Sequence, residues 1–214
     1  MTIRELLPDE GTKSLMTHDN FIKIVLGTSP EKAWIEIKKV FGERAYAETL
    51  FMAKKCLEDT SSDTILIRMR AMQVLALSPQ DKRTLDVLGK YLDSNLPYTG
   101  MVLRTMITTR NPAYTELYLG RMNSKNISNE NISISLGGLV DIANQSPERK
   151  KYIIKKVSVM LEETGKPKTY DESILQGYRT GLLIDLGVQN VDRKFPFWVA
   201  STETIKDAKI RKLQ

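Results

Sequence analysis

The sequence predicts an all-α fold, an α-solenoid of about five helical hairpins stacked on one another. The main evidence is the spacing of Pro79, Pro112 and Pro147, which follow one another at steps of 33 and 35 residues. A period in this range is typical of helical-repeat proteins. Each proline also separates an apolar segment with helical spacing from a second, more basic segment, as expected for paired amphipathic helices.

Length and composition place the chain among globular proteins. Its 214 residues are enough to bury a core without disulfides or metals. No window approaches the roughly 18 consecutive apolar residues of a membrane helix, and the first residues have no signal-peptide core. The single cysteine, Cys56, cannot form an internal disulfide. We therefore expect a cytoplasmic, reducing location and no contact with a membrane.

Three regions are expected along the chain. Residues 1–17 form a loosely ordered arm, since Pro8 and Gly11 interrupt any helical period. The repeat domain covers residues 18–200. Residues 201–214 then close its end as a capping helix or a tail, because the end units of a repeat array differ from the internal ones.

Local signals mark the first elements of the repeat domain. Ser29 and Pro30 predict a helix start, as N-cap and first helical residue, and Gly42 predicts its end. The next helix is expected over residues 43–57, where apolar residues recur every three or four positions. Cys56 lies beside this stripe, so we expect it to be a small buried hydrophobe.

From residue 62 to 161 the hairpin pattern occurs three times. When the three prolines are superposed, an apolar residue stands five positions before each and a polar residue directly before it. The apolar residues are Val74, Ile107 and Ile142, and the polar ones are Ser78, Asn111 and Ser146. We expect these polar residues to be N-caps, because each second helix begins with unpaired N–H groups.

Two further features concern packing. Gly137 and Gly138 lie inside a helical pattern and predict a place where two helices approach closely. Phe195, Phe197 and Trp198 form the densest aromatic cluster of the chain. Two interpretations of this cluster are open: it seals the last hydrophobic layer, or it presents an exposed anchor to a partner.

The pattern of paired helices, with Pro or Asp in the turn and a basic residue early in the second helix, resembles the HEAT-repeat family. The residues that carry the likeness are Pro79, Asp81, Arg83, Leu88 and Gly89, then Pro112, Leu119 and Gly120, then Pro147, Arg149 and Lys150. The resemblance implies a right-handed α-α superhelix whose second helices line a concave surface.

If the second helices line one surface, their basic residues share it. These residues are Lys82, Arg83, Lys90, Arg121, Arg149, Lys150, Lys151, Lys155, Lys156, Arg193 and Lys194. Residues 1–107 contain 15 basic and 14 acidic residues, whereas residues 108–214 contain 17 and 12, so the excess of positive charge lies in the second half. The alternative interpretation is that these residues form ordinary solvated helix faces.

Residues with catalytic or metal-binding chemistry are scarce in the sequence. One histidine, His18, and one cysteine cannot supply the usual zinc ligand sets, and no phosphate-binding glycine loop is present. We therefore predict no cofactor, no metal and no catalytic residue. The two tryptophans stand near opposite ends of the array. This argues against a base-removing enzyme of the HEAT-like DNA-repair type, which gathers aromatic and acidic residues at its groove.

Three functional hypotheses follow. The first is a non-catalytic scaffold or adaptor that binds a protein partner through its concave surface. The second is nucleic-acid binding, in which the basic residues of the second helices contact phosphates. The third and weakest is an accessory factor similar to the HEAT-like lyases that attach pigments to proteins. The sequence does not predict the oligomeric state.

Overall fold

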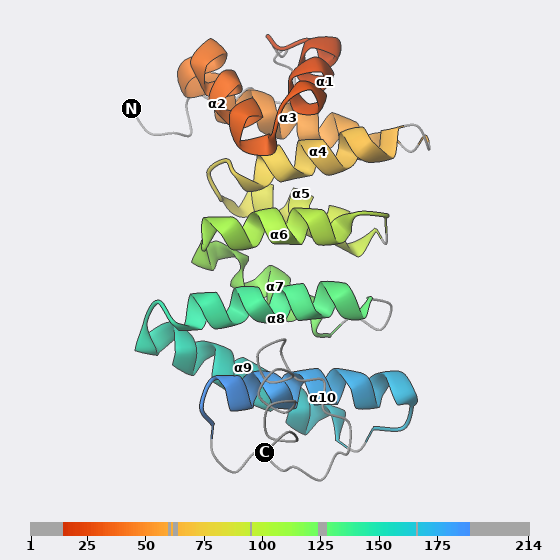
Figure 1. Ribbon diagram of the computed structural model, residues 1–214, viewed down its shortest axis with the longest axis vertical. Coiled ribbons are helices and arrows are strands. Elements are labelled where there is room, and N and C mark those ends of the chain that lie inside the picture. Colours follow the sequence, from red (N-terminus) through yellow and green to blue (C-terminus); the bar gives the residue numbers. More distant parts are fainter. Residues whose placement is uncertain are drawn as a thin grey trace, which may run out of the picture. The chain divides into compact units, whose positions relative to one another are not determined.

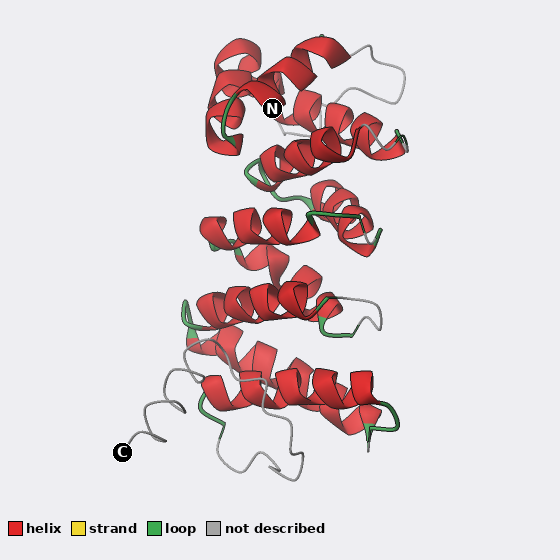
Figure 2. Cartoon of the chain, turned by 45° about the vertical axis from the view of Figure 1, so that its right-hand side comes forward, coloured by secondary structure: helices red, strands yellow, loops and turns green. Residues whose placement is uncertain are grey.

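The computed structural model describes residues 15–59, 61, 64–94, 96–123, 128–165 and 167–188. Every regular element in these residues is helical, as Figure 2 shows, so the all-α class is confirmed. Within the same residues, none of the helices combines the length and the apolar content that a membrane crossing requires. Most of the expected arm at 1–17 and the whole of the expected cap at 201–214 lie outside the described residues.

The helices follow one another with short connections and two 3₁₀ turns. They are α1 (His18–Gly27), α2 (Pro30–Phe41), η2 (Gly42–Arg44), α3 (Ala45–Glu58), α4 (Ile65–Ala76), α5 (Lys82–Asp93), α6 (Thr99–Thr109), η4 (Pro112–Tyr114), α7 (Thr115–Arg121), α8 (Asn129–Ala143), α9 (Pro147–Thr164) and α10 (Tyr170–Asp185). The chain divides into two compact units between Thr109 and Arg110. The N-terminal unit holds α1 to α6, and the C-terminal unit holds α7 to α10 (Figure 1).

In the N-terminal unit, α4 lies at the centre of the packing. It contacts α1, α2, α3, α5 and α6, so neighbours cover it on most sides. Met69 and every residue from Ala71 to Ala76 are buried. The polar Gln73 is buried among them, and its amide donates to Thr105 Oγ1 of α6 at 3.0 Å, which satisfies the group and ties the two helices together.

A buried carboxylate fixes the start of the described chain. Glu48 of α3 is 1% exposed and accepts hydrogen bonds from the backbone amides of Leu15 and Met16, both at 3.2 Å. The Arg44 guanidinium donates to the same carboxylate at 3.1 Å. Because a buried charge is costly unless it is paired, these contacts hold residues 15 and 16 against α3.

In the C-terminal unit, α8 packs against α7, α9 and α10. Figure 1 shows α8 and α10 lying side by side. Gly138 of α8 lies close against Tyr118 of α7, because a Cβ atom built at this position would lie 2.7 Å from the Tyr118 ring. The expected close approach is therefore confirmed at Gly138, while a Cβ at Gly137 would meet nothing within 4 Å.

Arg179 of α10 links the C-terminal ends of α7 and α9 in the C-terminal unit. It is 4% exposed, and its guanidinium donates to the backbone oxygens of Met122 and Met160, with the shortest bond 2.7 Å long. It also donates to Thr164 Oγ1 at 2.6 Å and Asn123 Oδ1 at 2.8 Å. Carbonyl oxygens near helix C-termini carry partial negative charge, so these acceptors compensate the buried cation. Burial nevertheless lowers the pKa of Arg179.

The expected helix starts at Ser29 and Ser146 are confirmed. The Ser29 hydroxyl accepts from the amide of Lys32 and the Ser146 hydroxyl from the amide of Arg149. Cys56 is buried as expected. Asn111 is also a cap, since its side chain accepts from Ala113 N at 3.0 Å. It caps the 3₁₀ turn η4, however, and α7 begins only at Thr115.

The expectation that Ser78 caps the next helix is wrong. Its hydroxyl donates to the Leu75 carbonyl at 2.7 Å and so belongs to the end of α4. The N-cap of α5 is Asp81, whose carboxylate accepts from Thr84 N. A carboxylate near a helix N-terminus also interacts favourably with the helix dipole, so Asp81 is the better cap.

Two neighbouring glycines allow a test of the packing between α7 and α8. We expect Gly138→Ala to destabilise the protein by about 1 to 3 kcal/mol, because the buried Tyr118 ring must move. Gly137→Ala should instead stabilise it by roughly 0.5 to 1 kcal/mol, because alanine loses less entropy than glycine in a helix. Denaturant unfolding of the two variants measures both values, and a change of the same sign in both would contradict the packing described here.

Candidate interaction surface

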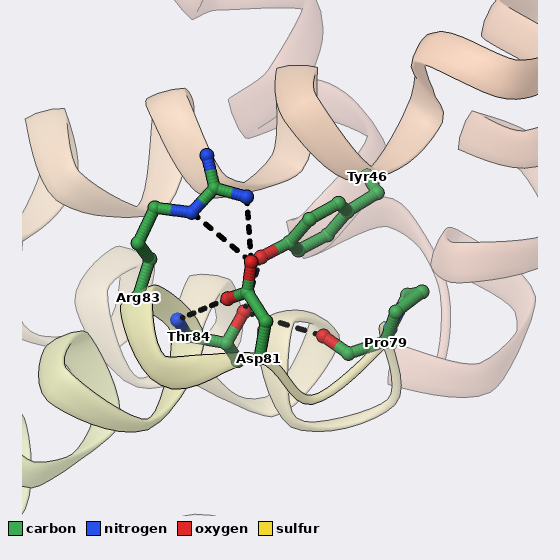
Figure 3. Close-up of polar contacts among 5 residues, drawn as sticks. All are labelled: Tyr46, Pro79, Asp81, Arg83 and Thr84. Carbon is green, nitrogen blue, oxygen red and sulfur yellow. Dashed lines mark hydrogen bonds and ion pairs between the residues drawn. The ribbon is translucent and has the colours of Figure 1, made fainter. Parts of the chain in front are cut away.

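The start of α5 is held against α3 by a polar cluster of five residues, Tyr46, Pro79, Asp81, Arg83 and Thr84 (Figure 3). Asp81 Oδ1 accepts from Thr84 N at 3.0 Å, while Oδ2 accepts from Arg83 Nε at 3.0 Å and from Arg83 Nη2 at 2.6 Å. The hydroxyls of Tyr46 and Thr84 lie 3.0 Å apart, and Thr84 Oγ1 lies 3.3 Å from the Pro79 carbonyl. The Arg83 guanidinium stands 5.9 Å from the centre of the Tyr46 ring.

Electrostatics in this cluster favour an ionised Asp81 beside a protonated Tyr46. Burial and a hydrogen bond to Asp81 raise the pKa of Tyr46 to about 12. Burial alone would also raise the pKa of Asp81. Hydrogen bonds from Tyr46, the Thr84 amide and Arg83 outweigh that effect and lower the pKa of Asp81 to about 2. The phenol therefore keeps its proton and donates it toward the carboxylate.

Of the three basic residues on α5, Arg83 has a structural role. Its charge is matched by Asp81, and its side chain covers the Tyr46 ring. Lys82 pairs with Asp86 at 2.7 Å, but both side chains are largely in solvent, and such pairs add little stability. Lys90 is exposed. Lys82 and Lys90 are therefore the more exposed cations of α5, while the Arg83 charge is matched by Asp81.

Arg121 was expected on the exposed surface, and this expectation is wrong. The residue is 6% exposed. It lies seven residues after Tyr114 and three after Tyr118, both of which are buried, so all three share one face of the turn η4 and helix α7. A position in a second helix does not by itself make a basic residue exposed, because the helical spacing places Arg121 on the core side.

On α9 the basic residues divide into two groups. Arg149 and Lys150 are half-buried, and the Arg149 guanidinium donates to Gln145 Oε1. Lys151, Lys155 and Lys156 are exposed on the side of the helix that faces away from the buried Ile153 and Val157. Those three lysines form no ion pair with any described residue.

Tyr152 stands among these lysines and was not singled out from the sequence. It is 43% exposed, its hydroxyl donates to Glu116 Oε1 of α7, and the Lys156 ammonium lies 5.5 Å from the centre of its ring. The hydrogen bond to Glu116 raises the pKa of Tyr152. Helical spacing alone would have found it, because Tyr152 lies four positions before Lys156 and therefore on the same side of α9.

Several expected features cannot be placed. Arg193, Lys194 and the aromatic cluster of Phe195, Phe197 and Trp198 lie outside the described residues. Across the described part of the chain, no group of three or more His, Cys, Asp or Glu side chains is arranged to hold a metal ion. Of the basic residues singled out from the sequence, those that are exposed in the described part of the chain are Lys82 and Lys90 in the N-terminal unit and Lys151, Lys155 and Lys156, with Tyr152 beside them, in the C-terminal unit.

Comparison with known proteins finds no family model, no curated protein and no solved structure that matches this chain. The residues themselves are therefore the basis for any functional proposal.

The Asp81 cluster should make stability depend on pH. Because the pKa of Asp81 falls from 3.8 to about 2 on folding, its contribution is complete above about pH 4 and is lost as the pH falls toward 2. We expect Asp81→Asn to lower the unfolding free energy by about 1 kcal/mol at pH 6, through loss of the charged cap. The difference from the unmodified protein should shrink between pH 4 and pH 2.

Asp86→Asn is the matched control, since it also neutralises a carboxylate on α5 but removes only a solvent-exposed pair. Its effect should stay within about 0.5 kcal/mol at every pH. Equal pH profiles for the two variants in denaturant titrations would show that Asp81 does not hold α5 as described.

Proposed function

We propose that this chain is an α-solenoid scaffold of the HEAT-like type that binds a protein partner through the face of its second helices, α5, α7 and α9. The observation that carries the proposal is the order of packing. In the N-terminal unit α2 contacts α3 and α4, α3 contacts α4 and α5, and α4 contacts α5 and α6. In the C-terminal unit α8 contacts both α9 and α10. Contacts with the next helix and the next but one are expected when hairpins stack in a row.

The exposed lysines of the second helices support a partner that carries acidic groups. They are Lys82 and Lys90 on α5 and Lys151, Lys155 and Lys156 on α9, and they stand beside exposed carboxylates such as Asp86 on α5 and Glu162 and Glu163 on α9. Lysine keeps its ammonium hydrated on a flexible stem, which suits a surface that attracts a partner of opposite charge. The second helices offer side chains for recognition, while α4 and α8 supply the buried framework.

Affinity capture from a native lysate with quantitative mass spectrometry tests this proposal. The variant Lys82→Glu/Lys90→Glu/Lys151→Glu should recover its partner at least about tenfold less well, because 1.4 kcal/mol of lost interaction is a factor of ten. The control Lys23→Glu/Lys39→Glu/Lys168→Glu carries the same change of charge at exposed positions outside the second helices. It should recover the partner as the unmodified protein does. Equal recovery by the two variants would contradict the proposed surface.

Nucleic-acid binding is the second candidate. Lys151, Lys155 and Lys156 are exposed on α9 within about one and a half turns, a spacing that suits neighbouring phosphates. Glu162 and Glu163 on the same helix weigh against it, because they would repel a backbone that continued along α9.

Fluorescence anisotropy with labelled DNA and RNA separates the two candidates. Three phosphate contacts would give a slope of about −2.7 in log K against log salt, so affinity would fall roughly 40-fold between 50 and 200 mM salt. The scaffold proposal expects no nucleic-acid binding at physiological salt. Binding with the steep slope would replace it by the second candidate.

A further inference from the structure

The exposed face of α9 carries acidic as well as basic residues, and the proposed function uses only the basic ones. Ile153 and Val157 are the buried side of this helix. The opposite side presents Lys151, Tyr152, Lys155, Lys156, Val159, Glu162 and Glu163, all of them exposed. Lys151 lies in the first part of the helix, close to the exposed Glu148, while Lys155 and Lys156 lie at its middle and the two glutamates near its end.

The spacing prevents these charges from pairing within the helix. Glu162 follows Lys155 by seven residues, and Glu163 follows Lys156 by seven. Side chains on a helix meet at separations of three or four residues, whereas seven residues span two turns and about 10 Å. The described residues accordingly show no ion pair from any of the four side chains.

The helix dipole does not account for the acidic end of this face. A helix is stabilised by acidic residues near its N-terminus and basic residues near its C-terminus. Glu148 in the first turn of α9 follows this rule, but the last turn has no basic residue, and Glu162 and Glu163 lie close to the C-terminal end at Thr164. These two glutamates are therefore available to an interaction with another molecule.

An apolar side chain separates the two groups of charges. Val159 is 40% exposed and lies midway between Lys155 and Lys156 on one side and Glu162 and Glu163 on the other. Viewed down the axis at 100° per residue, Lys155 and Glu162 flank Val159 on one edge, while Lys156 and Glu163 flank it on the other. The face therefore has two edges, each with one positive and one negative end.

We propose that α9 is a self-association surface, on which α9 of a second copy of this chain lies antiparallel, with a two-fold axis near Val159. In this arrangement Lys155 faces Glu162 of the second copy along one edge, and Lys156 faces Glu163 of the second copy along the other. The two Val159 side chains meet at the axis. Residues 155 and 162 lie almost equally far from position 159, and so do residues 156 and 163. Both pairings therefore place the two-fold axis at the same point on the helix.

A two-fold interface must be complementary to itself, and this face meets that requirement. A polyanion fits it less well, since the glutamates would oppose one end. The contact involves one helix face, which is smaller than the standard interfaces of about 1,600 Å², so we expect a weak, salt-sensitive dimer. Lys155 and Lys156 also belong to the proposed partner surface, but the capture variant above leaves Lys155, Lys156, Glu162 and Glu163 unchanged, so the two proposals can fail separately.

Sedimentation velocity over a range of protein concentrations, at 50 and 500 mM salt, tests the inference. The unmodified protein should shift from monomer to dimer as its concentration rises, and high salt should weaken the dimer at least about tenfold. Lys155→Glu/Lys156→Glu and Glu162→Lys/Glu163→Lys should each remain monomeric, because every facing pair then carries charges of the same sign. The control Lys39→Glu/Lys168→Glu has the same charge change as the first variant and should dimerise normally.

Two experiments that exchange the charges distinguish a broken interface from a variant that is monomeric because it misfolds. An equimolar mixture of the two monomeric variants should form a heterodimer, since one presents four glutamates and the other four lysines. The fourfold variant that exchanges both pairs should again form a homodimer. A protein that is monomeric at all concentrations in low salt, or a dimer that all these variants leave unchanged, would overturn the inference.

Discussion

An amphipathic helix cannot bury its apolar face by itself, and this constraint determines how the described part of the chain is built. Each helix obtains the missing cover from its neighbours along the sequence. In the N-terminal unit α4 has neighbours on most sides, which is why it is buried almost throughout and shows little contrast between its faces. In the C-terminal unit α8 has the same role. Helices at the side of the packing, such as α5 and α9, keep one buried stripe and one solvated face.

Polar side chains complement this packing at the helix ends, where backbone groups lack partners. Asp81 supplies an acceptor at the start of α5 and anchors it to Tyr46 of α3. Arg179 supplies donors to carbonyls at the ends of α7 and α9. These contacts are specific in geometry, so they determine how neighbouring helices align, whereas apolar burial alone tolerates many arrangements. The outward charges on α9 contribute nothing to this framework, which is why they are the best candidates for recognition.

Sequence reasoning succeeded where a local signal sufficed. Ser29 with Pro30 and Ser146 with Pro147 marked helix starts, because an N-cap and a first-turn proline act within one turn. It failed at Ser78, where the alignment of prolines suggested equal breaks but Asp81 three residues later was the cap. Arg179 could not be predicted, since its acceptors at Met122 and Met160 are far away in the sequence. The basic surface was anticipated in part: Lys151, Lys155 and Lys156 are exposed, whereas Arg121 is buried and Arg83 is matched by Asp81.

Native-state hydrogen exchange of backbone amides tests the central claim most directly, because it measures the opening free energy of each helix separately. If neighbours on both sides stabilise the central helices, the amides of α4 should exchange most slowly in the N-terminal unit and those of α8 most slowly in the C-terminal unit. The amides of α1 and α9, which have fewer covered sides, should exchange faster. Equal protection of all helices, or faster exchange in α4 than in α1, would contradict the account.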